Sequence, residues 1–460
     1  MQTLLRVYLG VVFTCALFLT SFVTSQAAPV QGALLADAVT PWGVRNHMAA
    51  LQRVADAHNG TRAAGTPGYA ASVRYVEKML RAAGYKVARQ PFSMTLTATL
   101  AETGRVRGGA LLNPKIMAGS PNTPVGGFTA PLVTPTDPLG CTTESESKLR
   151  GAVVLVRRGS CTFAEKSQKM AAAGAVATLV YNSGEPDNSP LFGSLGDSTS
   201  ERLEATVPTA GLTQAAGERL LEKLTGGAVK VRLELRTSRI TQKTANVIAE
   251  LPRTSGRVVM VGAHLDSVPE GPGINDNGSG VGLTLELARQ LARTGQAKGV
   301  RFAFWGAEEL GLLGSAHYVG GLSPAELKNI RAYLNFDMVS SPNAAPFAYG
   351  DPELTGLFTD EFAAAGLTLL PDAVGGRSDH APFEAAGIPV AGLFSGAEGV
   401  KPNREVGAYG GSTAPYDACY HRACDTLRGS STPTATRYLD LLADAAANAL
   451  QHLTAETAPK

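Results

Sequence analysis

Three apolar segments in the second half of the chain each end in side chains that can bind a metal ion or transfer a proton. Val258–Ala263 is followed by His264 and Asp266, Arg301–Trp305 by Glu308 and Glu309, and Ala332–Phe336 by Asp337. Open α/β sheets bind ligands beyond the carboxyl ends of their strands, so neighbouring parallel strands would bring these side chains to one edge. Imidazole and carboxylate ligands together suit zinc. The pattern therefore predicts a metal centre at that edge.

Two further segments add ligands of the same kinds. Asp276 lies in a glycine-rich stretch, residues 273–280, that opens a predicted helix, and His421 lies between Cys419 and Cys424. Carboxylates that gather in a buried site repel one another unless a cation balances them. A pair of divalent cations is the simplest arrangement that accounts for two histidines and several carboxylates together.

Each of these residues also has an ordinary structural explanation. A lone histidine such as His264 is more often bonded to backbone. Glu308 and Glu309 would suit the first turn of a helix, and Asp276 is a common type of helix cap. The joint placement at several strand ends favours the metal centre, in which Asp266, two residues beyond His264, would orient its imidazole.

The tripeptide Ser378-Asp379-His380 contains the residue types of a serine hydrolase. A nucleophilic serine on an α/β sheet normally lies in a G-x-S-x-G turn, a pattern that Gly278-Ser279-Gly280 lacks. Three adjacent residues also seldom form a catalytic triad. We therefore expect metal-dependent chemistry rather than a serine nucleophile.

The elements that must position these residues alternate regularly from about Thr244 onward. The predicted strands are Ala245–Leu251, Val258–Ala263, Arg301–Trp305, Ala332–Phe336 and Val390–Phe394, and the predicted helices include Gly280–Arg293 and Thr432–Thr454. Short apolar strands separated by helices indicate an α/β fold whose central, mostly parallel sheet is flanked by helices. Residues 45–85 have helical periodicity, and Lys86–Thr97 alternates like a strand.

The block at residues 103–236 differs from its surroundings. Glycine, proline and threonine are frequent up to Pro138, and short strands are predicted at 152–156, 176–181 and 229–235, with helices at 163–173 and 214–224. We interpret this block as a small β-rich domain inserted into the larger one.

The overall composition and charge exclude few classes of protein, whereas the N-terminal segment indicates the cellular compartment. The chain has 460 residues with 41 Lys+Arg and 39 Asp+Glu, a net charge of +2, which gives no reason to expect nucleic acid or a charged membrane as partner. Residues 1–27 combine Arg6, an apolar run from Val7 to Val23 and a small-residue end at Ala27. This pattern predicts a cleaved secretory signal peptide rather than a membrane anchor, and no second long apolar run follows.

Four cysteines remain once the signal peptide and Cys15 are removed. An even number in an exported chain suggests two disulfides. Proximity favours the pairs Cys141–Cys161 and Cys419–Cys424, although three pairings are possible. A four-thiolate zinc site would normally contain a C-x-x-C pair, which is missing.

Six motifs resemble the co-catalytic zinc aminopeptidases of peptidase family M28, whose fold is of the zinc aminopeptidase/phosphorylase–hydrolase type. In order they are G-A-H-L-D-S-V (262–268), G-I-N-D-N-G-S-G (273–280), W-G-A-E-E-L-G-L-L-G-S (305–315), L-N-F-D-M-V (334–339), R-S-D-H-A-P-F (377–383) and C-Y-H-R-A-C (419–424). The resemblance covers about residues 45–100 and 240–455.

The resemblance implies a role for each matching residue. His264 and Asp337 would hold one zinc ion, Glu309 and His421 would hold the other, Asp276 would bridge them, Glu308 would be the general base, Asp266 would support His264, and Arg377 and Tyr420 would contact the substrate. It also implies a cis peptide bond after Asp276.

The central block resembles a protease-associated (PA) domain in residues 151–166 and 171–182, and Cys141 and Cys161 fit the bridge usual in that domain. The expected organisation is a signal peptide (1–27), a discontinuous zinc peptidase domain (28–102 and 237–460) and an inserted PA domain (103–236).

Together these features predict a secreted, monomeric aminopeptidase with two zinc ions that removes residues, preferably hydrophobic, from peptides with free N-termini. Three alternatives remain open. They are another exopeptidase on the same fold, a one-zinc glutaminyl cyclase of related fold, and a binding module that has lost catalysis. The complete set of metal ligands argues against the last two.

Overall fold

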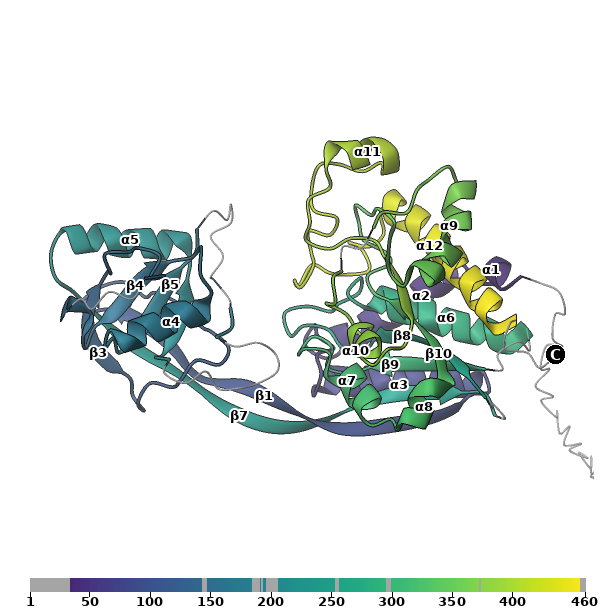
Figure 1. Ribbon diagram of the computed structural model, residues 1–460, viewed down its shortest axis with the longest axis horizontal. Coiled ribbons are helices and arrows are strands. Elements are labelled where there is room, and N and C mark those ends of the chain that lie inside the picture. Colours follow the sequence, from purple (N-terminus) through teal and green to yellow (C-terminus); the bar gives the residue numbers. More distant parts are fainter. Residues whose placement is uncertain are drawn as a thin grey trace, which may run out of the picture.

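The computed structural model describes residues 34–142, 147–183, 191, 193–195, 206–252, 256–294, 299–371 and 374–455. The predicted signal peptide, residues 1–27, lies outside these ranges. Figure 1 shows two lobes connected by a long two-stranded ribbon. We call the part that contains the predicted metal ligands the main lobe, and the part formed by the described residues between 107 and 228, at the far end of the ribbon, the distal lobe.

The main lobe is built on four parallel strands, as the sequence predicted. They are β8 (Val258–His264), β9 (Val300–Trp305), β10 (Ile330–Phe336) and β12 (Val390–Phe394), in the order β12-β10-β8-β9. Antiparallel strands flank them, β11 (Phe347–Gly350) beside β12 and β7 (Val229–Glu250) beside β9. β8 and β12 are buried along their whole length, which explains their continuous apolar sequences.

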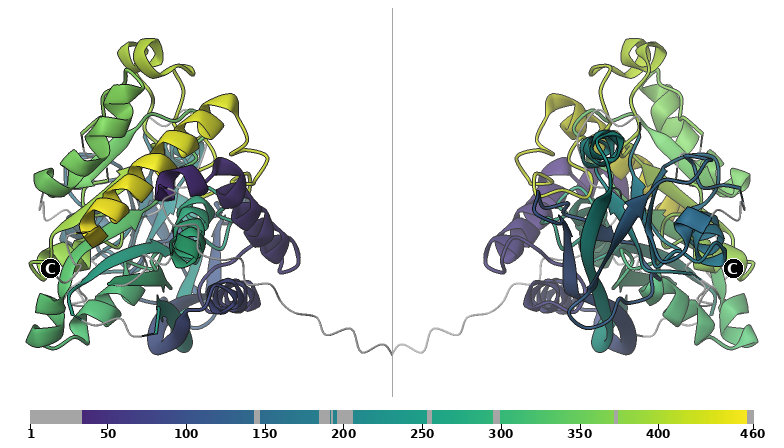
Figure 2. Two further views of the ribbon diagram at one scale, coloured as in Figure 1. Left: turned by 90° about the vertical axis from the view of Figure 1, so that its right-hand side faces the viewer. Right: turned by 90° about the vertical axis from the view of Figure 1, so that its left-hand side faces the viewer.

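Helices cover both faces of this sheet (Figure 2). One face packs against α1 (Leu35–Ala38), α2 (Pro41–Asp56), α3 (Pro67–Ala82), α6 (Gly278–Thr294), α9 (Pro352–Ala364) and α12 (Pro433–Ala455) in a large apolar core. A smaller core on the other face includes side chains of α7 (Leu313–Gly320) and α10 (Ala381–Ala385). The short helices α8 (Pro324–Asn329) and α11 (Asn403–Tyr409) complete the lobe.

The ribbon consists of β1 (Lys86–Val106) and β7, paired antiparallel from Lys86 opposite Glu250 to Val106 opposite Val231. The prediction of two separate strands at 229–235 and 245–251 was wrong, because β7 runs through both without a break. The residues between them, 236–244, are mostly polar on both faces, since the middle of the ribbon lies between the two lobes and is covered by neither (Figure 1). An uncovered strand lacks the alternating apolar pattern by which strands are recognised.

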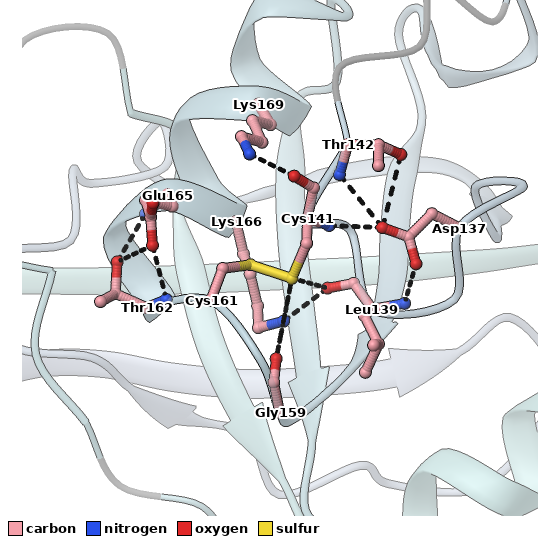
Figure 3. Close-up of a disulfide and its surroundings, with 10 residues drawn as sticks. All are labelled: Asp137, Leu139, Cys141, Thr142, Gly159, Cys161, Thr162, Glu165, Lys166 and Lys169. Carbon is pink, nitrogen blue, oxygen red and sulfur yellow. Dashed lines mark hydrogen bonds between the residues drawn. A yellow bond between two sulfur atoms is a disulfide. The ribbon is translucent and has the colours of Figure 1, made fainter.

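The strands of the distal lobe continue the same sheet through the pairing of β3 with β7, but the lobe has its own apolar cores. Its elements are β2 (Lys115–Ile116), β3 (Phe128–Val133), the short 3₁₀ helix at Ser147–Leu149, β4 (Val153–Arg157), α4 (Phe163–Ala172), β5 (Ala177–Tyr181), β6 (Thr209–Leu212) and α5 (Gln214–Thr225). One core packs against α5 and another against α4. A disulfide joins Cys141 to Cys161, with their Cα atoms 5.7 Å apart (Figure 3). Among the described residues, no helix has the length and apolarity that crossing a membrane requires.

Candidate metal centre

The parallel strands deliver three of the predicted ligand segments to one edge of the sheet. His264 is the last residue of β8 and pairs with Trp305, the last residue of β9. Glu308 and Glu309 follow β9 by a few residues, and Asp337 directly follows β10. Because β8 lies between β9 and β10, His264 is placed between the two groups of carboxylates.

Asp276 reaches the same edge from the loop that precedes α6. Helix α6 approaches the end of β10 so closely that a Cβ on Gly280 would lie 2.1 Å from the carbonyl oxygen of Phe336, so only glycine fits there. The side chain of Asn277 connects the two elements, since it accepts from the Gly280 N–H at 2.9 Å and donates to Phe336 O at 2.9 Å. The Asp276–Asn277 peptide bond is cis, as the resemblance implied.

His421 comes from the loop between Cys419 and Cys424. These two cysteines form the second disulfide, with Cα atoms 5.2 Å apart, so both predicted pairings are confirmed. The backbone of His421 is left-handed (φ 57°), and its ring stacks on that of Tyr420 at a centroid distance of 3.8 Å. The bridge closes a short loop that holds both rings at the site.

These segments form two groups of possible metal ligands that share Asp276. The first contains His264, Asp276 and Asp337, and the second contains Asp276, Glu309 and His421; within each group the ligand atoms lie within 4.8 Å of one another. In the first, His264 Nε2 lies 3.2 Å from Asp276 Oδ1 and 3.4 Å from Asp337 Oδ1. In the second, His421 Nε2 lies 3.2 Å from Asp276 Oδ2 and 3.0 Å from Glu309 Oε2. The two oxygens of Asp276 therefore face different groups.

The ligand atoms of the two groups are better suited to binding cations than to hydrogen bonding with one another. Within the described parts of the chain, Glu309 Oε1 and Asp337 Oδ1 are buried and accept no hydrogen bond. Buried polar atoms are normally satisfied, so unpaired oxygens in both groups call for a partner of another kind. Nitrogen and carboxylate donors in this number suit zinc.

The charges of the site support the same conclusion. Burial disfavours the imidazolium of His421, but hydrogen bonds to Asp276 and Glu309 outweigh burial and raise its pKa to about 10. Burial also opposes the charged form of His264, yet Glu308 and Asp337 raise its pKa well above the ordinary value. Burial raises the pKa of Glu309 to about 7. Without a metal ion, protons must balance the carboxylates, which shows how strongly the site favours positive charge.

Glu308 differs from the ligands. It is 8% exposed, its Oε2 lies 3.9 Å from His264 Nε2, and it belongs to neither ligand group. Burial raises the pKa of its carboxyl group well above the usual range, with nearby Asp379 adding to the effect. A buried carboxyl group with a raised pKa beside a metal centre has the properties of a general base.

Asp266 lies behind this arrangement. Its Oδ1 is 3.7 Å from His264 Nδ1, and its two oxygens accept the backbone N–H groups of Glu308 and Glu309 at 3.2 and 3.4 Å. It therefore braces the turn that carries the two glutamates more tightly than it holds His264.

The two groups of possible metal ligands line a cavity of about 340 Å³. Arg377 and Tyr420 line it together with Glu308, and its apolar wall is formed by Leu312, Met338, Val374, Phe394 and Ala397. Arg377 donates to Glu398 Oε1 at 2.9 Å and to the carbonyl of Val374 at 3.1 Å. Charged and apolar side chains thus both line the cavity.

Backbone strain is also concentrated here. Ala307, Leu312, Met338 and His421 have left-handed backbones (φ 51–60°) and all lie in or next to the cavity. Non-glycine residues adopt this conformation at a cost that the surrounding structure must offset, and such residues gather at functional sites.

The residues of the tripeptide Ser378-Asp379-His380 do not form a triad. Ser378 donates to Asp337 Oδ2 at 2.6 Å and accepts from Asn335 Nδ2 at 2.9 Å, so it holds a side chain of the first ligand group. The ring of His380 lies against that of Tyr349, with centroids 4.6 Å apart. The sequence argument against a serine nucleophile is consistent with these contacts.

Sequence reasoning missed two residues that hold the backbone around Asp276. Asp425 accepts the N–H groups of Asn275 and Asp276, and the buried guanidinium of Arg62 donates to carbonyl groups of the preceding loop. Neither contacts a ligand side chain, and Arg62 precedes the ligand motifs by about two hundred residues. Nothing in residue type or spacing points to such roles.

Comparisons with known proteins agree with the geometry. Residues 246–446 match the model of Peptidase family M28, and residues 128–220 match that of the PA domain. The chain is 42% identical over 432 residues to a Mycobacterium tuberculosis protein named probable lipoprotein aminopeptidase LpqL, covering 88% of this chain and 84% of that protein. An aminopeptidase of Pseudomonas aeruginosa is 38% identical over 410 residues, with 82% and 75% covered.

Solved structures give the same result. BSAP, a zinc aminopeptidase from Bacillus subtilis, superposes with a TM-score of 0.70 at 29% identity, covering 89% of this chain and 94% of that one. An aminopeptidase from Aneurinibacillus sp. strain AM-1 gives 0.69 at 28% identity, with 90% and 94% covered. From the matched residues, the sequence identity and the superposition, this chain belongs to peptidase family M28 and carries a PA domain.

Proposed function

We propose that this M28 peptidase is a secreted aminopeptidase that uses two zinc ions to hydrolyse the first peptide bond of peptides with a free N-terminus. The observation that carries the proposal is the pair of ligand groups sharing Asp276, both open to one cavity. His264 and Asp337 would hold one ion, Glu309 and His421 the other, and Asp276 would bridge them. Such a pair supplies Lewis acidity toward a carbonyl oxygen and makes water a better nucleophile at neutral pH.

The residues of the chain then divide the remaining work. Glu308 would accept a proton from the attacking water and pass it to the leaving amine, for which its buried carboxyl group is suited. The hydroxyl group of Tyr420 would donate a hydrogen bond to the oxygen on which negative charge develops, and Arg377 would contact the substrate carbonyl. The carboxylates of Glu308 and Asp337 would attract the substrate's α-ammonium group, which favours an aminopeptidase over a carboxypeptidase.

The cavity also supports a preference for hydrophobic N-terminal residues. Its apolar wall would contact the first side chain of the substrate, and a charged side chain placed there would lose its hydration without gaining a partner. The relatives named leucine aminopeptidase are consistent with this preference.

Metal analysis combined with a substrate panel tests the proposal. The purified protein is expected to contain two zinc ions per chain and to hydrolyse leucyl-anilide faster than glutamyl-anilide. N-acetylation of a test peptide should abolish cleavage, whereas C-terminal amidation should not. Cleavage of the acetylated peptide, or zinc below one ion per chain in the active protein, would contradict the proposal.

We also propose that the protein is exported as a monomer that acts without nucleic acid or membrane insertion. The features of residues 1–27 and the two disulfides support export, because disulfides persist in oxidising compartments. One relative is named a lipoprotein, but here the cysteine of the apolar run, Cys15, follows Thr14 and fits a lipid-attachment site poorly. Detection of the chain in culture medium, against its retention by cells, distinguishes release from anchoring.

The domain organisation is part of this proposal. Separate cores in the two lobes and the PA match at 128–220 support an inserted domain at 103–236, within a peptidase domain formed by 28–102 and 237–460. Limited proteolysis should cut between these units before it cuts within them.

A further inference from the structure

The loop that delivers the bridging ligand Asp276 is held by its backbone rather than by its side chains. This segment, residues 272–276, joins the loop after β8 to helix α6. Two ionisable side chains from distant parts of the chain, Arg62 and Asp425, bond to it from either end.

Arg62 holds the carbonyl groups. Its Nε donates to Pro272 O at 2.8 Å, and its two terminal nitrogens donate to Gly273 O and Leu265 O, each at 2.5 Å. The side chain is 0% exposed, so the guanidinium has exchanged water for these carbonyls. Burial lowers its pKa to about 10, while nearby carboxylates, Asp266 first, favour the charged form, so the group remains a cation at neutral pH. Hydrogen bonds from a buried cation are among the stronger ones in proteins.

Asp425 holds the amide groups. Its Oδ1 accepts from Asn275 N at 2.7 Å and its Oδ2 from Asp276 N at 3.0 Å, while its backbone oxygen accepts from Ile274 N at 3.2 Å. Asp425 is 3% exposed and follows Cys424 directly, so the disulfide loop that presents His421 and the segment that presents Asp276 are fixed to each other.

In the native structure the segment is packed closely against its partners. Gly273 has φ 59°, and a Cβ there would lie 2.3 Å from Asp276 O and 3.2 Å from an Arg62 nitrogen. The side chain of Asn275 is also engaged, donating to Asp417 Oδ2 at 2.7 Å. The backbone on both sides of Asp276 is therefore packed against its partners before any ligand side chain is considered.

We propose that Arg62 and Asp425 are positioning residues that together clamp residues 272–276 and hold Asp276 in its metal-binding position before zinc binds. The proposal rests on the assignment of Asp276 as the bridging ligand. A metal site whose ligands are already fixed spends no binding energy on ordering them, so the clamp acts on zinc affinity and not on proton transfer.

Zinc affinity and amide hydrogen exchange test the clamp without relying on turnover. Arg62→Met removes all three donors and leaves a shorter, unbranched apolar side chain, and Asp425→Asn replaces one acceptor oxygen by a donor nitrogen. Each variant is expected to bind zinc about 10- to 100-fold more weakly, measured by competition with a chelator. Arg62→Lys keeps the charge but lacks the planar fork of donors, so its affinity should lie between those of wild type and Arg62→Met.

Exchange in the metal-free protein gives a second readout, independent of whether zinc binds. The amides of Asn275 and Asp276 should exchange slowly in the metal-free wild type and quickly in both variants. The double variant should weaken zinc binding by less than the product of the two single effects, because either loss already frees the segment.

Lys166→Met in the distal lobe is a matched control. Lys166 is also 0% exposed and donates to two backbone carbonyls, Leu139 O at 2.5 Å and Gly159 O at 2.8 Å, beside the Cys141–Cys161 disulfide (Figure 3). Its loss should destabilise the distal lobe but leave zinc affinity unchanged.

The outcomes separate the two proposals. Unchanged zinc affinity in folded Arg62→Met and Asp425→Asn, or fast exchange of these amides in the metal-free wild type, would overturn the clamp. Equal weakening of zinc binding by Lys166→Met would overturn it too, because the effect would then be one of general stability. A wild type that binds no zinc would instead refute the proposed function.

Discussion

Replacing Glu308 by glutamine is expected to lower kcat by about 10²- to 10⁴-fold while leaving the zinc content unchanged. The substitution keeps the shape of the side chain and removes only the ability to accept a proton. Glu308 belongs to neither ligand group, and its backbone N–H bond to Asp266 does not involve the side chain. The site should therefore keep its geometry.

The expected loss corresponds to about 2.7–5.5 kcal/mol of activation free energy. Its size follows from the surroundings of Glu308, which is 8% exposed. Bulk water therefore has little access to this position and cannot easily accept the proton in place of Glu308. The assay is hydrolysis of leucyl-anilide at saturating zinc, with metal content measured on the same sample.

Glu309→Gln is the matched control, because it makes the same chemical change at the neighbouring residue, which does belong to a ligand group. It should lose zinc as well as activity. A zinc-replete Glu308→Gln enzyme with kcat within a few-fold of wild type would show that another group takes the proton.

Three further predictions concern the charges and disulfides of the site. Because the pKa values of His264, His421 and Glu309 are raised without metal, that of His421 to about 10 and that of Glu309 to about 7, zinc binding at pH 7 should release at least two protons; calorimetry in buffers of different ionisation enthalpy measures this, and no release would contradict the charge assignment. The raised pKa of His421 stabilises the metal-free fold fully below its unfolded value of 6.5, and this contribution is lost as the pH rises through 10. The Tm of the metal-free protein should therefore fall between pH 7 and 10, whereas a rise over this range would show that other groups dominate. Replacing Cys419 and Cys424 by serine should cost about 2 kcal/mol of stability and also weaken zinc binding through His421, whereas replacing Cys141 and Cys161 should cost about 3 kcal/mol and leave kcat unchanged. Denaturation and leucyl-anilide assays distinguish the two pairs, and equal effects on zinc binding would contradict the assigned role of the short loop.

The side chains of the two possible ligand groups could be expected to meet because each follows a pattern that is local in sequence. His264 and Asp337 each stand at the end of an apolar strand, and the order of such strands in an α/β sheet brings their ends together. The same reasoning found the disulfides, since each pair is close along the chain.

The features that were missed depend on contacts between distant segments. Arg62 bonds to Leu265 across 203 residues and Asp425 to Asp276 across 149, and both bind backbone atoms that carry no sequence signal. The continuous strand β7 was predicted as two strands because its middle is covered by neither lobe and so lacks apolar alternation. The apolar wall of the cavity is assembled from the end of β12 and from several loops, and nothing in its residue types marks these side chains as a common wall.

The pairing of β1 with β7 also affects how the chain can fold. Lys86 lies opposite Glu250, so once the ribbon has formed only residues 62–86 and 250–265 separate Arg62 from Leu265. The loop to be closed shrinks from 203 residues to about 40, which lowers its closure entropy cost by about 1.5 kcal/mol. We therefore expect β1 and β7 to pair first, starting from the distal lobe and proceeding toward Lys86 and Glu250. The amino-terminal helices would then dock late, and with them the arginine that completes the site.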